Sequence, residues 1–182
     1  MNGPAMEDKF HLTLTQNEKN YLLKRLNLNL NNLESASENA ILESIISKIK
    51  SIDEVLLYID GAAMPERQGA GIGGVCYKNK EKLFSFSKFI GNKTNNEAEY
   101  FALIQGLNQA LEINLKVITI YSDSQLIVNQ INGNYQVKNE RMKVCYQEAM
   151  NVLSNFTRWT ITHIPREKNK EADFLSKQGL QI

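Results

Sequence analysis

The sequence predicts an α/β domain preceded by a small N-terminal helical unit, in a chain of 182 residues. Short apolar runs separated by turn residues indicate three successive strands after residue 54. Segments with apolar residues at helical spacing then alternate with two further strands. Before residue 54 the apolar spacing is mainly helical. We therefore expect a helical extension of unknown role over 1–53 and the α/β domain over 54–182.

The composition is that of an ordinary globular protein, with 42% hydrophobic and 23% charged residues. No uninterrupted apolar run approaches the roughly 20 residues that span a bilayer, so no membrane association is expected. The first ten residues lack the basic and apolar blocks of a signal peptide, and a cytoplasmic location is the expectation. Cys76 and Cys145 have no metal-binding spacing and are too few for a disulfide framework, so buried free thiols are expected.

The charge distribution is more informative than the net charge of +1, which by itself argues against a strongly electrostatic nucleic-acid binder. Residues 54–182 hold 15 basic and 13 acidic residues, and setting four acidic candidates aside leaves 15 against 9, a net charge of +6. A negative focus on a mildly basic body suits a site that binds divalent cations and a polyanion together.

The first helix of the extension is predicted to start at Thr15, which resembles a capping box with Glu18. Leucines recur after it at near-helical spacing, but three of them also alternate with asparagines as in a strand: Leu26, Leu28 and Leu30. Residues 1–6 show no periodic pattern, and an expression-derived origin is one interpretation of them.

The second helix of the extension ends near Lys50 and carries an apolar stripe: Ile41, Leu42, Ile45, Ile46 and Ile49. Such a stripe needs a partner. The two interpretations are packing within the chain, and self-association or protein docking through residues 7–50.

Three strands open the main domain. Val55–Ile59 is a continuous apolar run, typical of a strand covered on both faces, and it ends at Asp60 and Gly61. The next strand, 69–77, is rich in glycine, so a backbone or a ligand is expected to approach it closely. The third, 83–89, follows a short polar link, and together they predict an antiparallel meander.

A helix over 97–113 follows three residues that favour helix N-caps: Thr94, Asn95 and Asn96. Glu99 lies on the apolar face of this helix, whereas Glu97 points elsewhere and is expected to be solvated. Burying an unpaired carboxylate is costly, so Glu99 is expected to have a cation partner.

The chain then returns in the strand 116–121, and a helical crossover normally makes such a strand parallel to an earlier one. If it lies beside Val55–Ile59, Asp60 and Asp123 meet near the same edge of the sheet. Asp123 has two interpretations, an N-cap for the helix 125–131 or a functional carboxylate.

The last part of the chain predicts a helix over 141–156 and a fifth strand over 158–164, closed by Pro165. Asn169 is expected to cap a final helix that carries Asp173.

Four carboxylates border apolar sequence at element ends: Asp60, Glu99, Asp123 and Asp173. Gathered in one pocket, they repel one another and would protonate unless cations neutralise them. Hard divalent ions such as Mg²⁺ take oxygen ligands and keep waters for chemistry. Two such ions about 3.5–4 Å apart activate a water and stabilise the leaving oxygen in phosphodiester hydrolysis.

Four segments in order resemble motifs of the ribonuclease H type 1 family: IDGAA at 59–63, TNNEAEYFALIQGL at 94–107, YSDSQ at 121–125 and HIPREKNKEAD at 163–173. The likeness covers about 54–180 and is nearest to the compact bacterial and archaeal, reverse-transcriptase-like branch. It implies an RNase H-like fold, with a mixed five-stranded sheet of three antiparallel and then two parallel strands, flanked by helices. It also implies hydrolysis of the RNA strand of RNA/DNA hybrids, leaving 5′-phosphate and 3′-hydroxyl ends.

The resemblance also implies roles for particular residues. The four carboxylates become ligands of two Mg²⁺ ions, with Mn²⁺ as a substitute, and Glu99 also helps to position the attacking water or a 2′-hydroxyl. His163 matches a histidine that assists product release or proton transfer, although by itself it suggests a surface histidine. The implied hybrid contacts are Gly61, Asn95, Asn96 and Gln125 in the minor groove, and Thr94 on a DNA phosphate.

Two departures from the family pattern bear on substrate affinity. Only NYQVKNE separates Gly133 from Arg141, so the basic protrusion of some relatives is missing, and the loop AAMPERQGAG differs from the commoner form. Candidate phosphate contacts in its place are Lys138, Arg141, Lys143 and Arg166. The intact carboxylate set favours an enzyme over a domain that only binds hybrid or double-stranded RNA, and double-stranded RNA is a second candidate partner.

Overall fold

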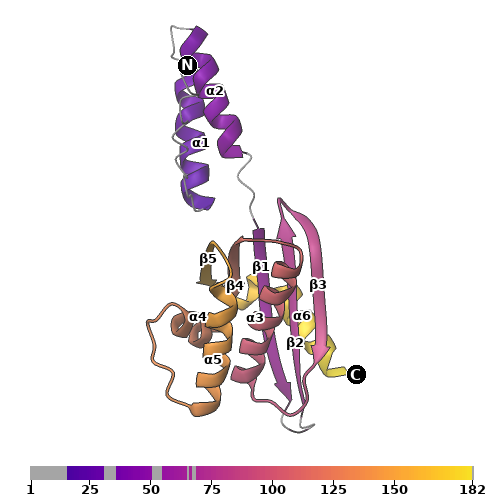
Figure 1. Cartoon of the computed structure of the whole chain (residues 1–182). Helices are drawn as coiled ribbons and strands as arrows, with labels where there is room; N and C mark the ends of the chain where they lie inside the picture. The colour runs from indigo at the N-terminus through magenta and orange to yellow at the C-terminus, as the bar shows by residue number, and fades with distance from the viewer. Residues whose placement is uncertain (1–15, 31–35, 51–54, 65, 67–68, 182) are drawn as a thin grey trace, which may run out of the picture. The chain divides into compact units, whose positions relative to one another are not determined.

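The structure is a computed structural model that describes residues 16–30, 36–50, 55–64, 66 and 69–181. The chain divides into two compact units, Met1–Asp53 and Glu54–Ile182 (Figure 1). Thr15, residues 1–6 and positions 65, 67 and 68 of the loop AAMPERQGAG lie outside the described residues. Within those that are described, no helix combines the length and the apolar character needed to cross a membrane.

The first unit contains two helices that contact each other, α1 (Gln16–Leu30) and α2 (Ala36–Lys50). The leucines that alternate with asparagines lie in α1, so the strand-like interpretation of that stretch is wrong. In α2, Ile46 and Ile49 are buried, whereas Ile41 and Ile45 are exposed. The predicted apolar stripe is therefore only partly covered.

The second unit is built on a five-stranded sheet with the strand order β3-β2-β1-β4-β5. Its strands are β1 (Val55–Met64), β2 (Gly69–Lys78), β3 (Glu81–Phe89), β4 (Val117–Ser122) and β5 (Arg158–His163). β1, β2 and β3 pair antiparallel, while β4 and β5 are parallel to β1. The predicted meander and parallel crossover are confirmed. Because Ile59 pairs with Ser122, the following residues Asp60 and Asp123 lie at neighbouring positions.

β1 is longer than predicted. It continues through Asp60 and Gly61 as far as Met64, because β2 stays paired with it along this length, with Asp60 opposite Gly73. The expectation that Asp60 follows the end of the first strand is therefore wrong. Asp60 lies inside the strand, where its backbone is fixed by sheet hydrogen bonds on the β2 side.

The two faces of β1 are covered unequally. Leu57 and Ile59 are fully buried, while Leu56 and Tyr58 on the other face are half-buried. The expected coverage of both faces is therefore confirmed for one face and wrong for the other.

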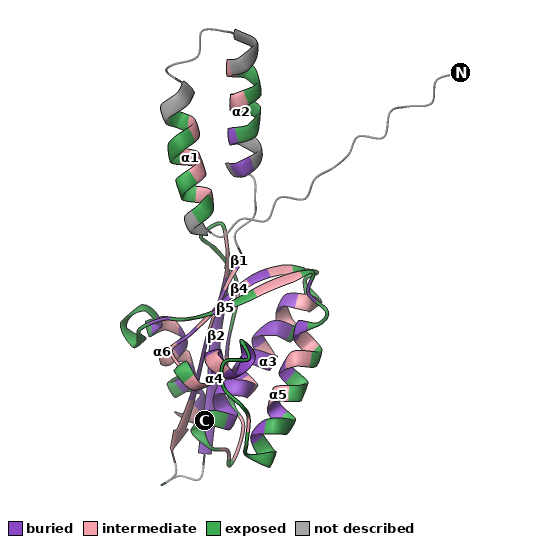
Figure 2. Ribbon diagram, turned by 90° about the vertical axis from the view of Figure 1, so that its left-hand side faces the viewer, coloured by how far each residue is buried: buried purple, intermediate pink, exposed green. Residues whose placement is uncertain are grey.

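Helices form a layer on each side of the sheet (Figure 1). α3 (Asn95–Glu112) packs on β1 and β2, and α5 (Glu140–Leu153) packs on α3. α6 (Lys170–Gln178) packs on β2 and β1 from the opposite side, and the short α4 (Gln125–Ile131) follows β4. α3 and α5 carry their buried residues on one side and their exposed residues on the other (Figure 2). The half-covered face of β1 is the face on which α6 lies, where Leu56 and Tyr58 line a cavity together with the start of α6.

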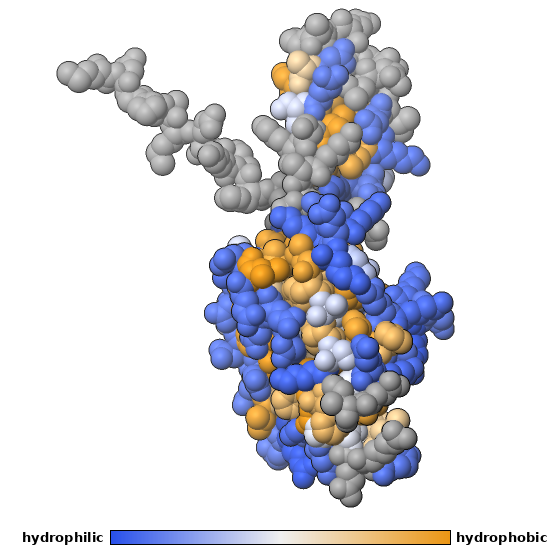
Figure 3. Space-filling view, turned by 90° about the vertical axis from the view of Figure 1, so that its right-hand side faces the viewer, coloured by the Kyte–Doolittle hydropathy of each residue, from blue (hydrophilic) through white to orange (hydrophobic). Residues whose placement is uncertain are grey.

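β3 is an edge strand of the sheet. It exposes two large apolar side chains, Leu83 and Phe89, but it also carries Glu81, Lys82 and Lys88. Figure 3 shows one face of the molecule on which hydrophobic and hydrophilic residues are interspersed. Charged side chains on an edge strand discourage pairing with other chains, so β3 is a protected edge.

Candidate active site

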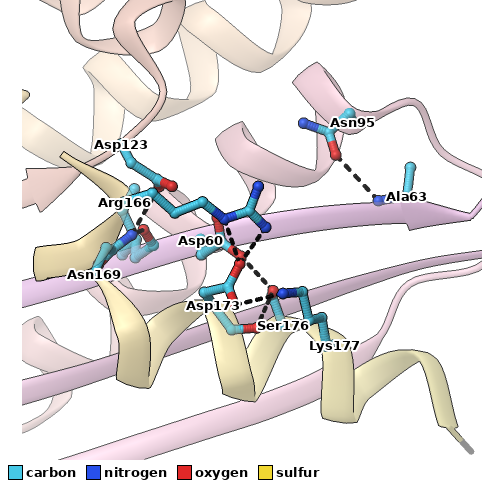
Figure 4. Close-up of polar contacts among 10 residues, drawn as sticks. Asp60, Ala63, Asn95, Asp123, Arg166, Asn169, Asp173, Ser176 and Lys177 are labelled. Atoms are coloured by element: carbon cyan, nitrogen blue, oxygen red, sulfur yellow. Dashed lines mark hydrogen bonds and ion pairs between the residues drawn. The ribbon is translucent and has the colours of Figure 1, made fainter. Parts of the chain in front are cut away.

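The predicted carboxylates meet at one cavity of about 740 Å³. Asp60 from β1, Glu99 from α3 and Asp123 after β4 line this cavity. Asp173 on α6 is bound to two residues that line it, Arg166 and Lys177 (Figure 4). Four separate elements thus bring the four carboxylates to the same end of the domain.

Gly61 explains how Glu99 reaches Asp60. A Cβ atom at Gly61 would lie 2.3 Å from both the carbonyl carbon of Ala98 and the amide nitrogen of Glu99. The first turn of α3 therefore lies directly on the backbone of β1, an approach that only glycine permits. The Gly61 amide also donates a hydrogen bond to the Glu99 carboxylate.

The glycines of β2 place α6 in the same way. A Cβ atom at Gly73 would lie 2.2 Å from the amide nitrogen of Ser176, so α6 lies against the backbone of β2. The expected close approach to the glycine-rich strand is confirmed, and a helix backbone makes it. As a result, the buried Ser176 hydroxyl donates a hydrogen bond to the Asp60 carboxylate (Figure 4).

Burial and mutual repulsion disfavour the ionised forms of two carboxylates. Asp60 is 4% exposed and Glu99 is 5% exposed. Burial raises the pKa of Asp60 to about 6, with the hydrogen bond from Ser176 opposing it and the charges of Asp123 and Asp173 adding to it. Burial, followed by the charges of Asp60 and Asp123, raises the pKa of Glu99 well above its usual range. Positive charge in the cavity would relieve both effects.

The donor set fits hard divalent cations. All the candidate ligand atoms are carboxylate oxygens, and Glu99 Oε2 is buried with no hydrogen-bond partner among the described residues. In the described part of the chain, however, no three acidic, histidine or cysteine side chains converge tightly enough to hold one ion together. The carboxylates are close enough to repel one another, but their side chains are not arranged as a complete coordination shell.

Asp173 accounts for part of this difference, because its carboxylate is turned toward cations of the protein. It accepts hydrogen bonds from Arg166 Nε at 2.9 Å and Lys177 Nζ at 2.6 Å (Figure 4). Burial opposes ionisation of Asp173, but the hydrogen bonds from Lys177 and Arg166 outweigh it and hold the pKa below its ordinary value. An ion at Asp173 would compete with these two cations for the carboxylate oxygens.

Asn169 is a residue whose role sequence reasoning missed. It occupies the N-cap position of α6, but its side chain makes no capping hydrogen bond, so the expected side-chain cap is wrong. Its Nδ2 instead donates to Asp123 Oδ1 at 2.8 Å and to the Ile59 carbonyl at 2.9 Å. Asn169 therefore orients Asp123 against β1. An asparagine at a helix start resembles a cap in the sequence, and only the tertiary contact distinguishes the two roles.

Lys177 and Ser176 were missed as well, although a local signal was present. Asp173, Ser176 and Lys177 stand at i, i+3 and i+4 of one helix, which places them on one face. Arg166, which the sequence offered only as a phosphate contact, lines the cavity and binds Asp173.

Some of the predicted substrate-binding residues line the cavity and others do not. Asn95 lines the cavity, and its Oδ1 accepts a hydrogen bond from the Ala63 amide at 3.2 Å (Figure 4). Asn96 and Gln125 are exposed in the first turns of α3 and α4, and neither lines the cavity. His163 is exposed at the end of β5, opposite Ser122, and also lies outside the lining.

Thr94 is the N-cap of α3, and with Glu97 it forms a reciprocal capping box. Glu97 is buried and accepts hydrogen bonds from the Thr94 amide at 2.9 Å and its hydroxyl at 2.8 Å. These bonds, chiefly the one from the amide, hold the pKa of Glu97 below its usual value. The expectation of a solvated Glu97 is therefore wrong, because the residue closes the helix end instead of facing water.

The capping interpretation of Asp123 is also wrong. Ser124 is the N-cap of α4, and its hydroxyl accepts a hydrogen bond from the Ile127 amide at 3.5 Å. Asp123 accepts from Asn169 and lines the cavity instead. Because Asp123 does not cap α4, its carboxylate can face the cavity.

The candidate phosphate contacts other than Arg166 do not line this cavity. Lys143 is paired with Glu140 on the exposed side of α5, with 2.7 Å between Nζ and Oε1. Among the residues that the structure describes, Arg166 and Lys177 are the cations that line the cavity.

Comparison with known proteins identifies the family. A family model described as reverse transcriptase-like matches residues 58–179. Ribonuclease HI of Haemophilus influenzae is 30% identical over 143 residues, which cover 70% of this chain and 90% of that protein. Ribonuclease HI of Halobacterium salinarum is 33% identical over 124 residues, covering 68% of this chain and 62% of that protein, so the chain spans less than two thirds of this relative.

Solved structures agree with this assignment. The crystal structure of RNase H1 from Halobacterium salinarum has a TM-score of 0.67 at 33% identity, covering 70% of this chain and 97% of that one. LC11-RNase H1, solved in complex with an RNA/DNA hybrid, has a TM-score of 0.65 at 34% identity, covering 69% and 95%. With its mixed sheet and its gathered carboxylates, the chain belongs to the ribonuclease HI family.

Proposed function

We propose that this chain hydrolyses the RNA strand of RNA/DNA hybrids with two divalent ions, leaving 5′-phosphate and 3′-hydroxyl ends. The observation that carries the proposal is the meeting of Asp60, Glu99 and Asp123 at one cavity with Asp173 beside it. Buried carboxylates that repel one another are suited to binding cations for phosphodiester chemistry. The hybrid bound to the relative LC11-RNase H1 supports the substrate.

Each carboxylate has a proposed part in this reaction. Asp60, Glu99 and Asp123 would hold Mg²⁺, with Mn²⁺ as a substitute, and Asp173 would join them after exchanging Arg166 and Lys177 for an ion. When bound, the two ions supply an activated water and stabilise the leaving oxygen. Glu99 Oε2, which has no hydrogen-bond partner among the described residues, would orient the attacking water or a 2′-hydroxyl. Asn169 holds Asp123 in place.

Substrate contacts are proposed around the cavity. Gly61 and Asn95 are part of its lining, and Asn96 and Gln125 are exposed in nearby helix starts, where they would contact the minor groove of the hybrid. The Thr94 hydroxyl already takes part in the capping box, so a DNA phosphate bound there would share it with Glu97. His163, exposed at the end of β5, would assist proton transfer or product release.

One gel tests the proposal. Labelled RNA/DNA hybrid, double-stranded RNA and DNA are each incubated with the full chain, with and without Mg²⁺. We expect a cut RNA strand in the hybrid only when Mg²⁺ is present, and the double-stranded RNA lane tests the second candidate substrate. If the hybrid stays intact at high protein concentration while a shift assay shows binding, the chain is a binding domain and the proposal fails.

For the N-terminal unit we propose self-association or contact with a protein partner through residues 7–50. The exposed side chains of Tyr21, Ile41 and Ile45 support this role, since they are large apolar groups on a small helical unit. The cytoplasmic location stays a prediction from the sequence.

A further inference from the structure

A second cavity, of about 300 Å³, lies against the α6-covered face of the sheet. Strands β1 and β2, the turn after β2 and the start of α6 contribute its lining: Leu56, Tyr58, Val75, Tyr77, Lys80, Lys168, Asn169, Glu171 and Ala172. None of these residues lines the carboxylate cavity. Its volume is at the lower end of the range for small-molecule sites.

The charge of this cavity is positive. Glu171, its one carboxylate, is held by Lys82 at 2.5 Å and accepts a hydrogen bond from the Tyr77 hydroxyl. Lys80, in the turn after β2, and Lys168, just before α6, both line the cavity. Neither forms an ion pair within the described residues. Two lysines and one carboxylate line the cavity, and because Lys82 pairs with that carboxylate from outside the lining, the charges of Lys80 and Lys168 are left uncompensated, which favours an anion.

The floor of the cavity is aromatic and apolar. The rings of Tyr58 and Tyr77 meet edge to face, with 6.3 Å between centroids and 83° between planes. Tyr58 also stacks on Tyr121, with 5.1 Å between centroids and 29° between planes. Leu56 and Val75 line the same space. Such a surface suits a planar ring, because bases stack on aromatic side chains regardless of their identity.

Asn169 adds a specific polar group. Its side chain is 1% exposed, and its Oδ1 has no hydrogen-bond partner among the described residues. The orientation of the amide is fixed, because Nδ2 donates to two groups that can only accept, the Ile59 carbonyl and the Asp123 carboxylate. The remaining oxygen is an acceptor without a donor in a residue that lines this cavity, and because the atom itself is buried, a ligand donor reaches it only when the neighbouring side chains shift.

We propose that this cavity binds a nucleoside monophosphate, with the phosphate between Lys80 and Lys168, the base on the tyrosine rings, and an N–H or O–H of the ligand on Asn169. An inorganic anion would leave the aromatic floor unused, and an uncharged ring would leave the lysines unused. The proposal does not depend on the catalytic one, because none of the four carboxylates takes part. Through Asn169 the bound ligand would touch the residue that orients Asp123.

The test is a titration of the full chain with AMP in the presence of EDTA, followed by NMR chemical-shift changes. Chelation keeps phosphate away from the carboxylate cavity, where unneutralised acids repel it. Adenosine and inorganic phosphate are titrated in parallel. We expect AMP to bind about tenfold more tightly than either fragment, with shifts around Tyr77 and Asn169.

Variants separate the site from general charge. The double substitution Lys80→Gln and Lys168→Gln should weaken AMP binding about tenfold, since charged hydrogen bonds to phosphate are lost. The double substitution Lys88→Gln and Lys116→Gln, at two exposed lysines outside the cavity, removes the same charge and is the matched control, which should bind AMP as the unchanged protein does. Equal AMP affinity in the cavity double variant and in the control, or shifts confined to the carboxylate cavity, would overturn the proposal. Neither result bears on hybrid cleavage.

Discussion

At the scale of single residues, hydrogen-bond donors decide which carboxylate oxygens stay available. Ser176 donates a hydrogen bond to Asp60, and Asn169 donates one to Asp123. Glu99 Oε2, by contrast, has no hydrogen-bond partner among the described residues. Both oxygens of Asp173 are bound by cations of the protein, Oδ1 by Arg166 and Oδ2 by Lys177. The site therefore combines three kinds of carboxylate oxygen. Asp60 and Asp123 have oxygens held by hydrogen bonds, Glu99 has one oxygen without a partner among the described residues, and the oxygens of Asp173 bind cations of the protein.

Replacing Asp123 tests the ligand role directly. In Asp123→Asn the side chain keeps its shape, and its carbonyl oxygen can still accept from Asn169. The negative charge is lost, so we expect the rate of hybrid cleavage with Mg²⁺ to fall by at least about a hundredfold, the scale of losing one electrostatic group at a reacting centre. The melting temperature should not fall, because repulsion of Asp60 and Glu99 is relieved. Activity near the original rate would remove Asp123 from the mechanism.

Gly61→Ala tests the contact that places Glu99. The added methyl group would collide with the backbone of α3, so we expect the free energy of unfolding to fall by about 1–3 kcal/mol, as in overpacked cores. Cleavage should also fall, because Glu99 moves away from Asp60.

Gly91→Ala is the control for Gly61→Ala. Gly91 has a φ of +73° and open space around its missing Cβ, so only backbone strain of about 1 kcal/mol is expected there, with cleavage unchanged. Denaturant unfolding and a single-turnover assay measure both variants. If Gly61→Ala resembles Gly91→Ala in both measurements, the close approach does not control the site.

At the scale of elements, the start of α3 joins structure and function. The capping box of Thr94 and Glu97 fixes the first turn, and that turn carries Asn95 to the cavity and Glu99 to Asp60. α6 acts similarly from the other face of the sheet, where close packing on Gly73 sets the position of Ser176 and Asp173. The position of the site is thus set by two close helix–strand contacts, α3 on β1 and α6 on β2.

Thr94→Ala should lower the free energy of unfolding by about 0.5–2 kcal/mol, since an N-cap hydroxyl is lost. Thr94→Ser keeps the hydroxyl and should retain the stability. If Thr94 also binds a DNA phosphate, the alanine variant will raise the KM for hybrid and the serine variant will not. A serine variant as unstable as the alanine variant would show that the methyl group, and not the cap, matters here.

At the scale of the whole molecule, the chain divides at Asp53 and Glu54. Every candidate site residue lies in the second unit, together with both cavities. The first unit contributes exposed apolar side chains and no candidate catalytic group. We therefore predict that hybrid cleavage depends on the second unit and self-association on the first.

We expect residues 54–182 alone to cleave hybrid at the rate of the full chain, because the fragment contains the complete carboxylate set. A large loss in a folded fragment, judged by circular dichroism, would give the first unit a part in catalysis. Light scattering on both proteins tests self-association. If the full chain and the fragment show the same number of chains per particle, dimerisation through residues 7–50 is excluded.

Much of this protein could be predicted from local patterns. The apolar runs predicted the strands and the antiparallel meander of the first three, and the helical spacing around Glu99 placed it on a buried face. The direct succession of an apolar strand and Asp123 suggested its position at the sheet edge, and the parallel pairing of β1 and β4 confirms it. These features depend on residues that are neighbours in the chain or repeat at a fixed period, so local sequence was enough to predict them.

The remaining features could be seen only in the folded chain. It showed that Asp60 lies within β1, that Asn169 binds Asp123 instead of capping α6, and that Asp173 is paired with Arg166 and Lys177. It also showed the second cavity. Each of these features depends on which faces meet and how closely, and that distance is set by Gly61 and Gly73 against helices that are remote in the chain. Periodicity predicts which face of an element is buried, but the partner that buries it is fixed by packing alone.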